Sequence, residues 1–222
     1  MGERRVHAVL FDLDGTLADT AADLAGALNR QRARHGLDPL AFGALRPYAS
    51  HGARGLIAQG FGVAPEDDRF AALREEFLRL YEEALCVETR LFPGAEKVLD
   101  TLEERGLPWG IVTNKVASLT RPLLDRLGLA QRTGCLVCGD TTPHPKPHPE
   151  PLLHAARALR VPPANCVYVG DGERDMEAAH RAGMLGLVAR YGYITAEERP
   201  ESWPHLGLID TLDALLDHLD AG

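Results

Sequence analysis

The sequence predicts an α/β fold in which a parallel sheet carries an inserted block of helices. Short apolar runs alternate with helical patterns from residue 91 onward, whereas residues 19–87 contain helical patterns only. Alternating strands and helices build a parallel sheet through right-handed crossovers, with both faces of the sheet covered. With 222 residues and 45% hydrophobic composition, the chain is long enough for such a core and an insertion.

The insertion follows the first strand directly. The apolar run at 6–11 predicts that strand, and a helix is expected from about residue 20 to Gly36. A stretch rich in proline and glycine comes next, followed by a short helix through residues 56–57. The best helical pattern predicts a helix that begins at Pro65, because acidic residues occupy its first turn and the apolar residues keep one face.

The second part of the chain predicts the rest of the sheet. Helices are expected between the remaining strands, and a closing helix is expected over 212–219. Four further strands are expected at 109–113, 135–138, 166–169 and 185–189.

These elements divide the chain into two predicted domains. Residues 1–17 and 90–222 would form the parallel-sheet core, and residues 18–89 would form an all-helical cap. Because the insertion leaves the carboxyl end of the first strand, it would cover that edge of the sheet, where open α/β sheets bind ligands. We expect hinges near Leu17–Ala18 and Thr89–Arg90.

Composition limits the class of partner and the compartment. The net charge of −8 argues against nucleic acid or an anionic membrane as partner, because both require clustered cations. The first apolar run is too short for a signal peptide, and no stretch approaches the ~20 apolar residues of a membrane span. We therefore expect a cytoplasmic protein without membrane or nucleic-acid partners, either a monomer or a homodimer.

The four cysteines do not predict a disulfide framework at this length. Cys135 and Cys138 form a Cys-x-x-Cys pair, but the surrounding residues predict a strand, in which positions i and i+3 point to opposite faces. Buried, unreactive thiols are the expected outcome, rather than a zinc or redox site.

Polar residues follow four of the predicted strands, and a parallel sheet would bring them to one edge. Each has an ordinary alternative as a turn acid, a helix cap or a solvated lysine. However, the chain contains only three lysines against 21 arginines, and two of the three stand at this edge. Paired acids with a flexible glycine and a nearby hydroxyl can hold a hard dication, leaving one acid free to attack a polarised group. The residues at the edge are Asp12, Asp14, Gly15, Thr16, Thr113, Asn114, Lys115, Lys146, Asp171 and Asp175.

In this order the residues resemble the four motifs of the haloacid dehalogenase-like hydrolase superfamily. The resemblance covers nearly the whole chain and includes the helical cap between the first two motifs. It implies a Rossmann-like core and a magnesium-dependent phosphomonoesterase that works through an aspartyl-phosphate. The motifs are Asp12-x-Asp14-Gly15-Thr16, Thr113-Asn114, Lys146 and Gly170-Asp171-x-x-x-Asp175.

The resemblance also implies the catalytic roles. Asp12 would be the nucleophile, and Asp14 would protonate the leaving alkoxide and later deprotonate the hydrolytic water. Thr113 and the backbone amide of Asn114 would hold phosphoryl oxygens. Lys146 would neutralise the nucleophile and the phosphate, since a phosphate dianion otherwise repels an attacking carboxylate.

A magnesium site is implied at the same place. Asp12, the backbone carbonyl of Asp14, and Asp171 would bind Mg²⁺, while Asp175 and Thr16 would support that site without direct ligation. Oxygen ligands of this kind suit Mg²⁺, which retains some waters in an octahedral shell.

Other members of the superfamily fit less well. A dehalogenase does not need the second acid, and a phosphonoacetaldehyde hydrolase needs a cap lysine, which residues 18–89 lack. A phosphomutase like β-phosphoglucomutase shares these motifs and stays an alternative. A binding protein with a dead site would be expected to lack Asp12, Asp14 or Lys146, and all three are present.

Within the superfamily, the chain resembles the phosphoglycolate phosphatase group, through segments such as 112–115 and 146–152. Finer features at 50–54, at 189–194 and at Trp203 resemble a bacterial subgroup that acts on N-acetylmuramic acid 6-phosphate in cell-wall recycling, a branch of carbohydrate metabolism. The alternative substrate is 2-phosphoglycolate.

The cap is expected to decide between these substrates. His51 and Arg54 lie in its glycine-punctuated break, which can reach a bound ligand, although an ordinary solvated loop is the alternative. In the functional interpretation Arg54 would pair with a substrate carboxylate, which both substrates possess. His144 and His148 flank Lys146, and we expect exposed or hydrogen-bonding loop residues there rather than metal ligands.

Overall fold

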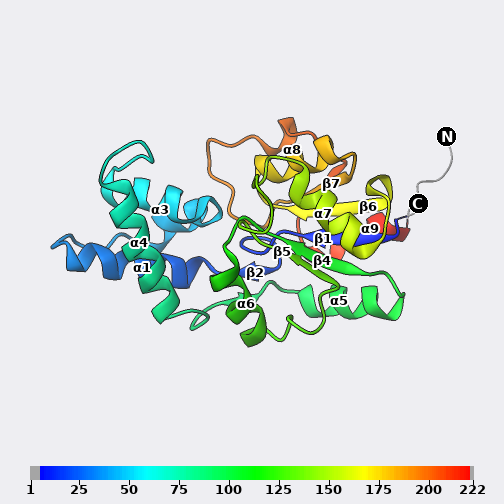
Figure 1. Ribbon diagram of the computed structural model, residues 1–222, viewed down its shortest axis with the longest axis horizontal. Helices are drawn as coiled ribbons and strands as arrows, with labels where there is room; N and C mark the ends of the chain where they lie inside the picture. Colours follow the sequence, from blue (N-terminus) through cyan, green and yellow to red (C-terminus); the bar gives the residue numbers. More distant parts are fainter. Residues whose placement is uncertain (1–5, 221–222) are drawn as a thin grey trace.

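The computed structural model describes residues 6–220 and contains a six-stranded parallel sheet in the order β5-β4-β1-β6-β7-β8 (Figure 1). The sheet confirms the predicted α/β class. Its strands are β1 (Ala8–Phe11), β4 (Trp109–Val112), β5 (Cys135–Val137), β6 (Cys166–Gly170), β7 (Leu185–Ala189) and β8 (Gly207–Ile209).

The first strand occupies the middle of the sheet. Val9 pairs with Trp109 of β4 on one side and with Val167 of β6 on the other. All four residues of β1 are buried, as expected for a parallel strand with helices on both faces. This central position places the chain that leaves β1 between the loops that leave β4 and β6.

Helices cover both faces of the sheet (Figure 1). Val9 and Phe11 point into one apolar cluster, and Ala8 and Leu10 point into the other, because side chains alternate along a strand. The first cluster receives α5, α6 and α9, and the second receives α7 and α8. These helices are α5 (Ala95–Glu104), α6 (Ala117–Arg126), α7 (Glu150–Leu159), α8 (Glu173–Ala182) and α9 (Leu215–Asp220).

In the sequence, the remaining α-helices come after β2 (Ala18–Asp19) and before β3 (Arg90–Leu91). These two short strands pair with each other as a small antiparallel sheet. The helices pack together at one end of the molecule (Figure 1). The small sheet, which we did not predict, joins the two segments expected to act as hinges. The helices are α1 (Ala21–Arg34), α2 (Phe42–Leu45), α3 (Gly52–Phe61) and α4 (Phe70–Glu83), with a 3₁₀ turn, η1 (Arg46–His51), before α3.

One predicted helix starts at a different residue in the structure, and one strand of the main sheet was not predicted. The long helix begins at Phe70 rather than Pro65, because residues 64–69 form turns in which the Asp67 carboxylate accepts the Arg69 backbone N–H at 2.9 Å. The strand Gly207–Ile209 was not predicted, since a run of three residues is too short to show an alternating period. All four cysteines are free; Cys138 and Cys166 are buried as expected, whereas Cys86 and Cys135 are partly exposed, and burial raises the pKa of Cys135 to about 12 and of Cys166 to about 11.

Among residues 6–220, no helix is both long enough and apolar enough to span a membrane.

Candidate active site

The structure brings the four predicted motifs together at the carboxyl edge of the sheet. Asp12 follows β1, Thr113 follows β4, Lys146 lies in the loop after β5, and Asp171 follows β6. Because β5, β4, β1 and β6 are neighbours, these residues converge although they are far apart in sequence. All four are buried.

Lys146 is the central cation of the site, and its side chain is fully buried. Its Nζ atom lies 3.0 Å from Oδ1 of Asp12 and 2.7 Å from Oδ1 of Asp175. It also lies within hydrogen-bond distance of the Val112 carbonyl, at 2.9 Å, and the Tyr168 hydroxyl, at 2.7 Å. A lysine held by two carboxylates and two further oxygens can hardly move, so its charge is fixed beside Asp12.

Asn114 holds the backbone of that lysine. Its side-chain Nδ2 donates to the Lys146 carbonyl, and its Oδ1 accepts the Lys146 N–H, both at 3.0 Å. This side-chain function was not anticipated, because the prediction concerned only the Asn114 backbone amide. Thr113 lies next to it, with its Oγ1 accepting the Lys115 N–H at 3.2 Å.

Three carboxylates form a buried acidic cluster. Asp12, Asp171 and Asp175 each offer an oxygen, and these oxygens lie within 4.8 Å of one another. Burial and the charges of Asp12 and Asp175 raise the pKa of Asp171 to about 7. Burial also raises the pKa of Asp12, despite the opposing charge of Lys146. The cluster therefore carries more negative charge than its surroundings neutralise, which is the environment that a bound cation relieves.

Asp175 differs from the other two acids because its pKa is lowered, whereas the pKa values of Asp12 and Asp171 are raised. Oδ1 contacts Lys146 and the Tyr168 hydroxyl, and Oδ2 accepts the Gly172 N–H at 3.0 Å. Although burial opposes it, the charges of Lys146 and Arg174 keep the pKa of Asp175 below its usual range. Asp175 is thus suited to holding Lys146 rather than to ligating a metal.

Two glycines let the chain approach Asp171. Gly15 has φ +82°, and a Cβ atom there would lie 2.0 Å from Oδ2 of Asp171. A Cβ at Gly192 would lie 2.4 Å from the Asp171 Cβ, while the neighbouring Tyr193 N–H donates to Asp171 Oδ2 at 2.8 Å. Thr16 is buried close by in sequence, but its hydroxyl has no hydrogen-bond partner within residues 6–220. Its predicted support of a metal site stays a prediction.

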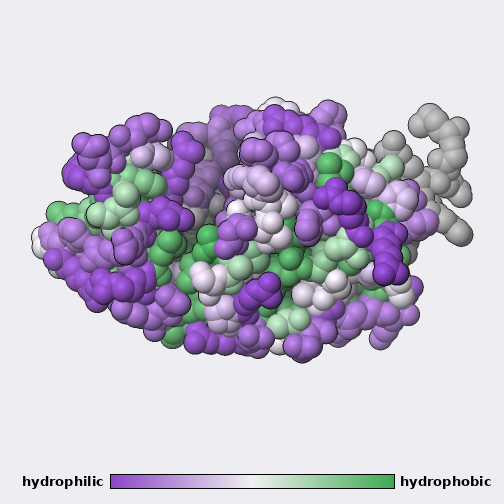
Figure 2. All heavy atoms as spheres, in the orientation of Figure 1, coloured by the Kyte–Doolittle hydropathy of each residue, from purple (hydrophilic) through white to green (hydrophobic). Residues whose placement is uncertain are grey.

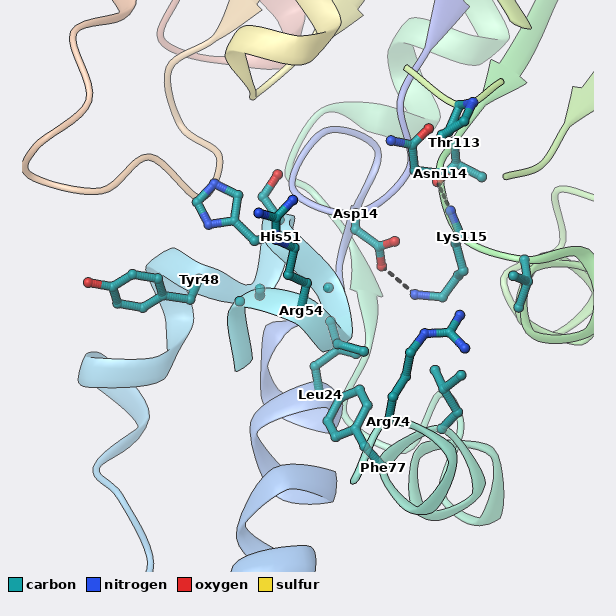
Figure 3. A pocket seen from close by; sticks show the side chains of 18 of the residues that line it. Asp14, Leu24, Tyr48, His51, Arg54, Arg74, Phe77, Thr113, Asn114 and Lys115 are labelled. Atoms are coloured by element: carbon teal, nitrogen blue, oxygen red, sulfur yellow. Dashed lines mark hydrogen bonds and ion pairs between the residues drawn. The ribbon is translucent and has the colours of Figure 1, made fainter. Parts of the chain in front are cut away.

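The Asp14 side chain does not join the acidic cluster. Its Oδ1 accepts Lys115 Nζ at 2.7 Å and the Thr20 hydroxyl at 2.6 Å (Figure 3). The Lys115 ammonium also lies 4.8 Å from the ring centroid of Tyr81, which belongs to α4 of the insertion. No role was predicted for Lys115, although the scarcity of lysine in the chain was a signal that could have found it.

A cavity of about 940 Å³ opens above these residues, between the insertion and the sheet edge. The surface view shows a recess between the helical end of the molecule and the remainder (Figure 2). His51 and Arg54 line the cavity, which leaves their predicted contact with substrate a prediction, and Arg74 of α4, which was not predicted, lines it as well. Apolar side chains complete the wall on the insertion side, among them Leu24, Phe77, Leu78 and Tyr81.

His144 and His148 lie outside this cavity lining. Both are exposed, and their rings are 4.7 Å apart. The described residues offer one candidate metal cluster, and it contains neither histidine. This agrees with the prediction of ordinary loop histidines.

Comparison with known proteins identifies the family. The family model described as haloacid dehalogenase-like hydrolase matches residues 9–189. The N-acetylmuramic acid 6-phosphate phosphatase of Pseudomonas aeruginosa is 40% identical over 220 residues, covering 99% of this chain and 97% of the relative. The phosphoglycolate phosphatase of Xanthomonas campestris is 45% identical over 197 residues, covering 89% of each chain.

A solved structure shows the same fold over the same extent. It is described as a predicted phosphoglycolate phosphatase from Haemophilus somnus, with a TM-score of 0.84 and 27% identity. The comparison covers 98% of this chain and 99% of that one. The family match, the two relatives and the shared fold agree with the resemblance found in the motifs. The chain therefore belongs to the haloacid dehalogenase-like hydrolase family, as one of its phosphatases.

Proposed function

We propose that the protein hydrolyses a small carboxylate-bearing phosphate monoester through an aspartyl-phosphate on Asp12, and that its substrate is N-acetylmuramic acid 6-phosphate. The observation that carries the chemistry is the fixed contact between Lys146 and Asp12 at the floor of a cavity. The observation that carries the substrate class is a pair of cap arginines in the same cavity that have no partner in the part of the chain that the structure describes.

The catalytic roles that we propose are those implied by the resemblance of the motifs. A carboxylate oxygen of Asp12 attacks the phosphorus, and the ester P–O bond breaks as Asp14 donates a proton to the leaving alkoxide. Asp14 then takes a proton from the water that hydrolyses the acyl phosphate, which restores Asp12 and releases inorganic phosphate. Lys146, Thr113 and the Asn114 amide stabilise the charge on the phosphoryl oxygens.

The acidic residues suit a magnesium ion. We propose that Asp12, Asp171 and the backbone carbonyl of Asp14 hold it, because burial raises the pKa of Asp12 and Asp171, whereas Lys146 and Arg174 already lower that of Asp175. Oxygen donors in a buried, uncompensated acidic cluster favour a hard dication. When bound, Mg²⁺ supplies positive charge that keeps Asp12 ionised and reduces its repulsion of the phosphate.

The charges in the cavity indicate the substrate class. Five lysines and arginines line it, and three of them contact other groups: Lys115 contacts Asp14, Lys146 contacts Asp12, and Arg174 contacts Ser50. Neither Arg54 nor Arg74 has a hydrogen-bond or ion-pair partner within the described residues. Two free guanidinium groups in a protein of net charge −8 favour a substrate with an anionic group besides its phosphate.

The size and polarity of the cavity favour the amino sugar over glycolate. Both substrates carry a carboxylate, but 2-phosphoglycolate has almost no apolar surface to place against Leu24, Phe77 and Leu78. N-acetylmuramic acid 6-phosphate has a sugar ring, an acetyl group and a lactyl group, which such a wall can contact. The relatives named for each substrate support both candidates.

We also propose that residues 18–89 form a cap that moves about the small β2–β3 sheet. The chain enters and leaves the insertion there, where Ala18 pairs with Leu91 and Asp19 with Arg90. A hinge at two neighbouring strands would let the helices open for substrate and close to exclude water.

The substrate assignment is tested by steady-state phosphate release in the presence of Mg²⁺. We expect kcat/KM for N-acetylmuramic acid 6-phosphate to exceed that for 2-phosphoglycolate by a hundredfold or more, about 2.7 kcal/mol of differential transition-state binding. Asp12→Asn is the control for both. The reverse preference would make 2-phosphoglycolate the substrate. No release from either, together with conversion between sugar phosphate isomers, would support the phosphomutase alternative. No reaction of either kind would support a binding protein.

A further inference from the structure

Arg174 joins the sheet edge to the cap. It lies in the first turn of α8, where a cation is unfavourable beside the helix N-terminus, and three residues after the proposed metal ligand Asp171. Its Nη2 atom donates to the carbonyl of Ser50 at 2.8 Å and to the Ser50 hydroxyl at 2.7 Å. Ser50 lies in η1 of the insertion, 124 positions away in sequence. The catalytic motifs give this arginine no role.

Ser50 completes the connection by contacting Asp171. Its hydroxyl donates to Oδ1 of Asp171 at 3.0 Å. A guanidinium can only donate and a hydroxyl has one proton, so Ser50 accepts from Arg174 and donates to Asp171. We call Arg174, Ser50 and Asp171 the clasp. It places one cap residue between a cation and an acid of the catalytic edge.

Through Ser50, the clasp lies directly before residues 51–54, the segment that we expect to contact the substrate and select it. Ser50 is followed directly by residues 51–54, and His51 and Arg54 at the ends of that segment both line the cavity. In Figure 3 the Arg54 side chain lies beside His51, and the guanidinium next to the Asp14–Lys115 pair is that of Arg74. Among residues 6–220, Arg54 itself has no hydrogen-bond or ion-pair partner that would hold it in place. The start of its helix must therefore be held from elsewhere.

The other side-chain hydrogen bonds and ion pairs of η1 are longer. The Arg46 guanidinium lies 3.3 Å from Asp19 and 3.5 Å from the Gly192 carbonyl, and His51 Nε2 lies 3.8 Å from Oε1 of Glu198. The clasp has three contacts of 3.0 Å or less, two of them from a charged donor. Charge-assisted contacts of this length are the stronger ones.

We infer that Arg174 and Ser50 are positioning residues that hold residues 51–54 over the cavity, so that Arg54 meets the carboxylate of the substrate. This inference rests on the proposed function for the identity of the carboxylate, but not for the clasp itself. In this arrangement Arg174 and Ser50 contribute to substrate selection, whereas Asp171 is in addition the proposed metal ligand.

The kinetic test compares N-acetylmuramic acid 6-phosphate with N-acetylglucosamine 6-phosphate. The second sugar has a hydroxyl where the first has a lactyl ether, the group that carries the carboxylate. In the magnesium-loaded enzyme, Ser50→Ala should lower kcat/KM about tenfold on the first, mainly through KM, and less than about threefold on the second. The double variant Ser50→Ala with Arg54→Ala should be no slower than Arg54→Ala alone, since both act through one contact. Ser202→Ala, which removes an exposed hydroxyl bonded to the Arg199 carbonyl, is the matched control.

Arg174→Lys separates geometry from charge. It keeps the positive charge beside the acids but loses the planar guanidinium, so it should behave like Ser50→Ala. Full retention of substrate selection in Arg174→Lys would overturn the inference, because charge alone would then be sufficient. An equal loss on both substrates would also overturn it, since Arg174 would then act on the phosphate that both share.

Amide hydrogen exchange tests the clasp without turnover. Peptides covering 46–61 should exchange at least about threefold faster in Ser50→Ala and Arg174→Lys than in the wild type or Ser202→Ala. Unchanged exchange would overturn the clasp whatever the substrate is. Faster exchange in an enzyme that does not hydrolyse either sugar phosphate would support the clasp and contradict the proposed substrate.

Discussion

The two walls of the cavity treat charge in opposite ways. On the sheet side, Lys146 and Asp12 are buried and in contact, and Lys115 contacts Asp14. On the cap side, Arg54 and Arg74 are exposed and have no partner within the described residues. The lysines on the sheet side already have carboxylate partners, whereas the two arginines on the cap side are available to pair with an anionic ligand.

This difference indicates a division of labour. The Lys146–Asp12 pair is in place before the substrate arrives and needs no rearrangement at the moment of reaction, which is what catalysis of phosphoryl transfer requires. Unpaired guanidinium groups gain most from a ligand that brings the missing anion, which is what selection requires. We therefore assign the chemistry to the sheet edge and the choice of substrate to the cap.

The largest effect is expected from the nucleophile. Asp12→Asn removes the attacking oxygen's charge while keeping its shape, so kcat should fall by at least about a thousandfold on every phosphate ester. Initial rates of phosphate release measure this, with circular dichroism to confirm folding. A loss confined to one substrate would break the comparison, because the sheet wall would then be selecting substrates.

Lys146→Met should damage both rate and stability. It leaves Asp12 and Asp175 as buried acids without their cation, which should lower the free energy of unfolding by about 3–5 kcal/mol and kcat by about a hundredfold. Urea denaturation measures the first effect and phosphate release the second. The matched control is Lys97→Met, whose exposed ion pair with Asp213 should change stability by less than about 1 kcal/mol. Equal destabilisation by both variants would contradict a paired sheet wall.

Metal affinity should depend on pH through Asp171. Its pKa of about 7 lies above the value near 4 expected when unfolded, so the metal-free native state binds the additional proton. Asp171 should therefore make the metal-free protein less stable as pH rises from about 4 to 7. Because Mg²⁺ competes with that proton, its dissociation constant should increase about thirtyfold from pH 8 to pH 5.5. Calorimetric titration measures it, and a constant affinity over this range would exclude Asp171 as a ligand.

The smallest effects should come from the cap arginines. Arg54→Ala and Arg74→Ala should each lower kcat/KM about tenfold on N-acetylmuramic acid 6-phosphate and leave N-acetylglucosamine 6-phosphate nearly unaffected. Arg79→Ala is the control, since Arg79 is exposed on the same helix as Arg74 but does not line the cavity. Parallel losses on both sugars would show that these arginines bind a group other than the carboxylate.

The same contrast explains what the sequence could predict. Asp12, Thr113, Lys146 and Asp171 stand at strand ends, so their convergence follows from the order of strands in a parallel sheet. The fold class and the family were predicted from these motifs and are confirmed. The roles assigned to the individual residues stay predictions.

Other residues depend on contacts that no local pattern records. Arg74 lies within the predicted amphipathic helix, but nothing in the helical period shows which exposed arginine faces a cavity. Arg174 gains its partner from a segment 124 positions away. The two-residue strands at Ala18 and Arg90 are likewise fixed by their pairing with each other rather than by their own pattern.

The most direct test of the division between the walls is the ratio of kcat/KM for N-acetylmuramic acid 6-phosphate to that for N-acetylglucosamine 6-phosphate. We predict a ratio of about a hundredfold or more in the wild type, which should approach one in the double variant Arg54→Ala with Arg74→Ala. The rate on N-acetylglucosamine 6-phosphate should hardly change. Equal rates on the two sugars in the wild type, or a ratio that survives loss of both arginines, would contradict selection by the cap.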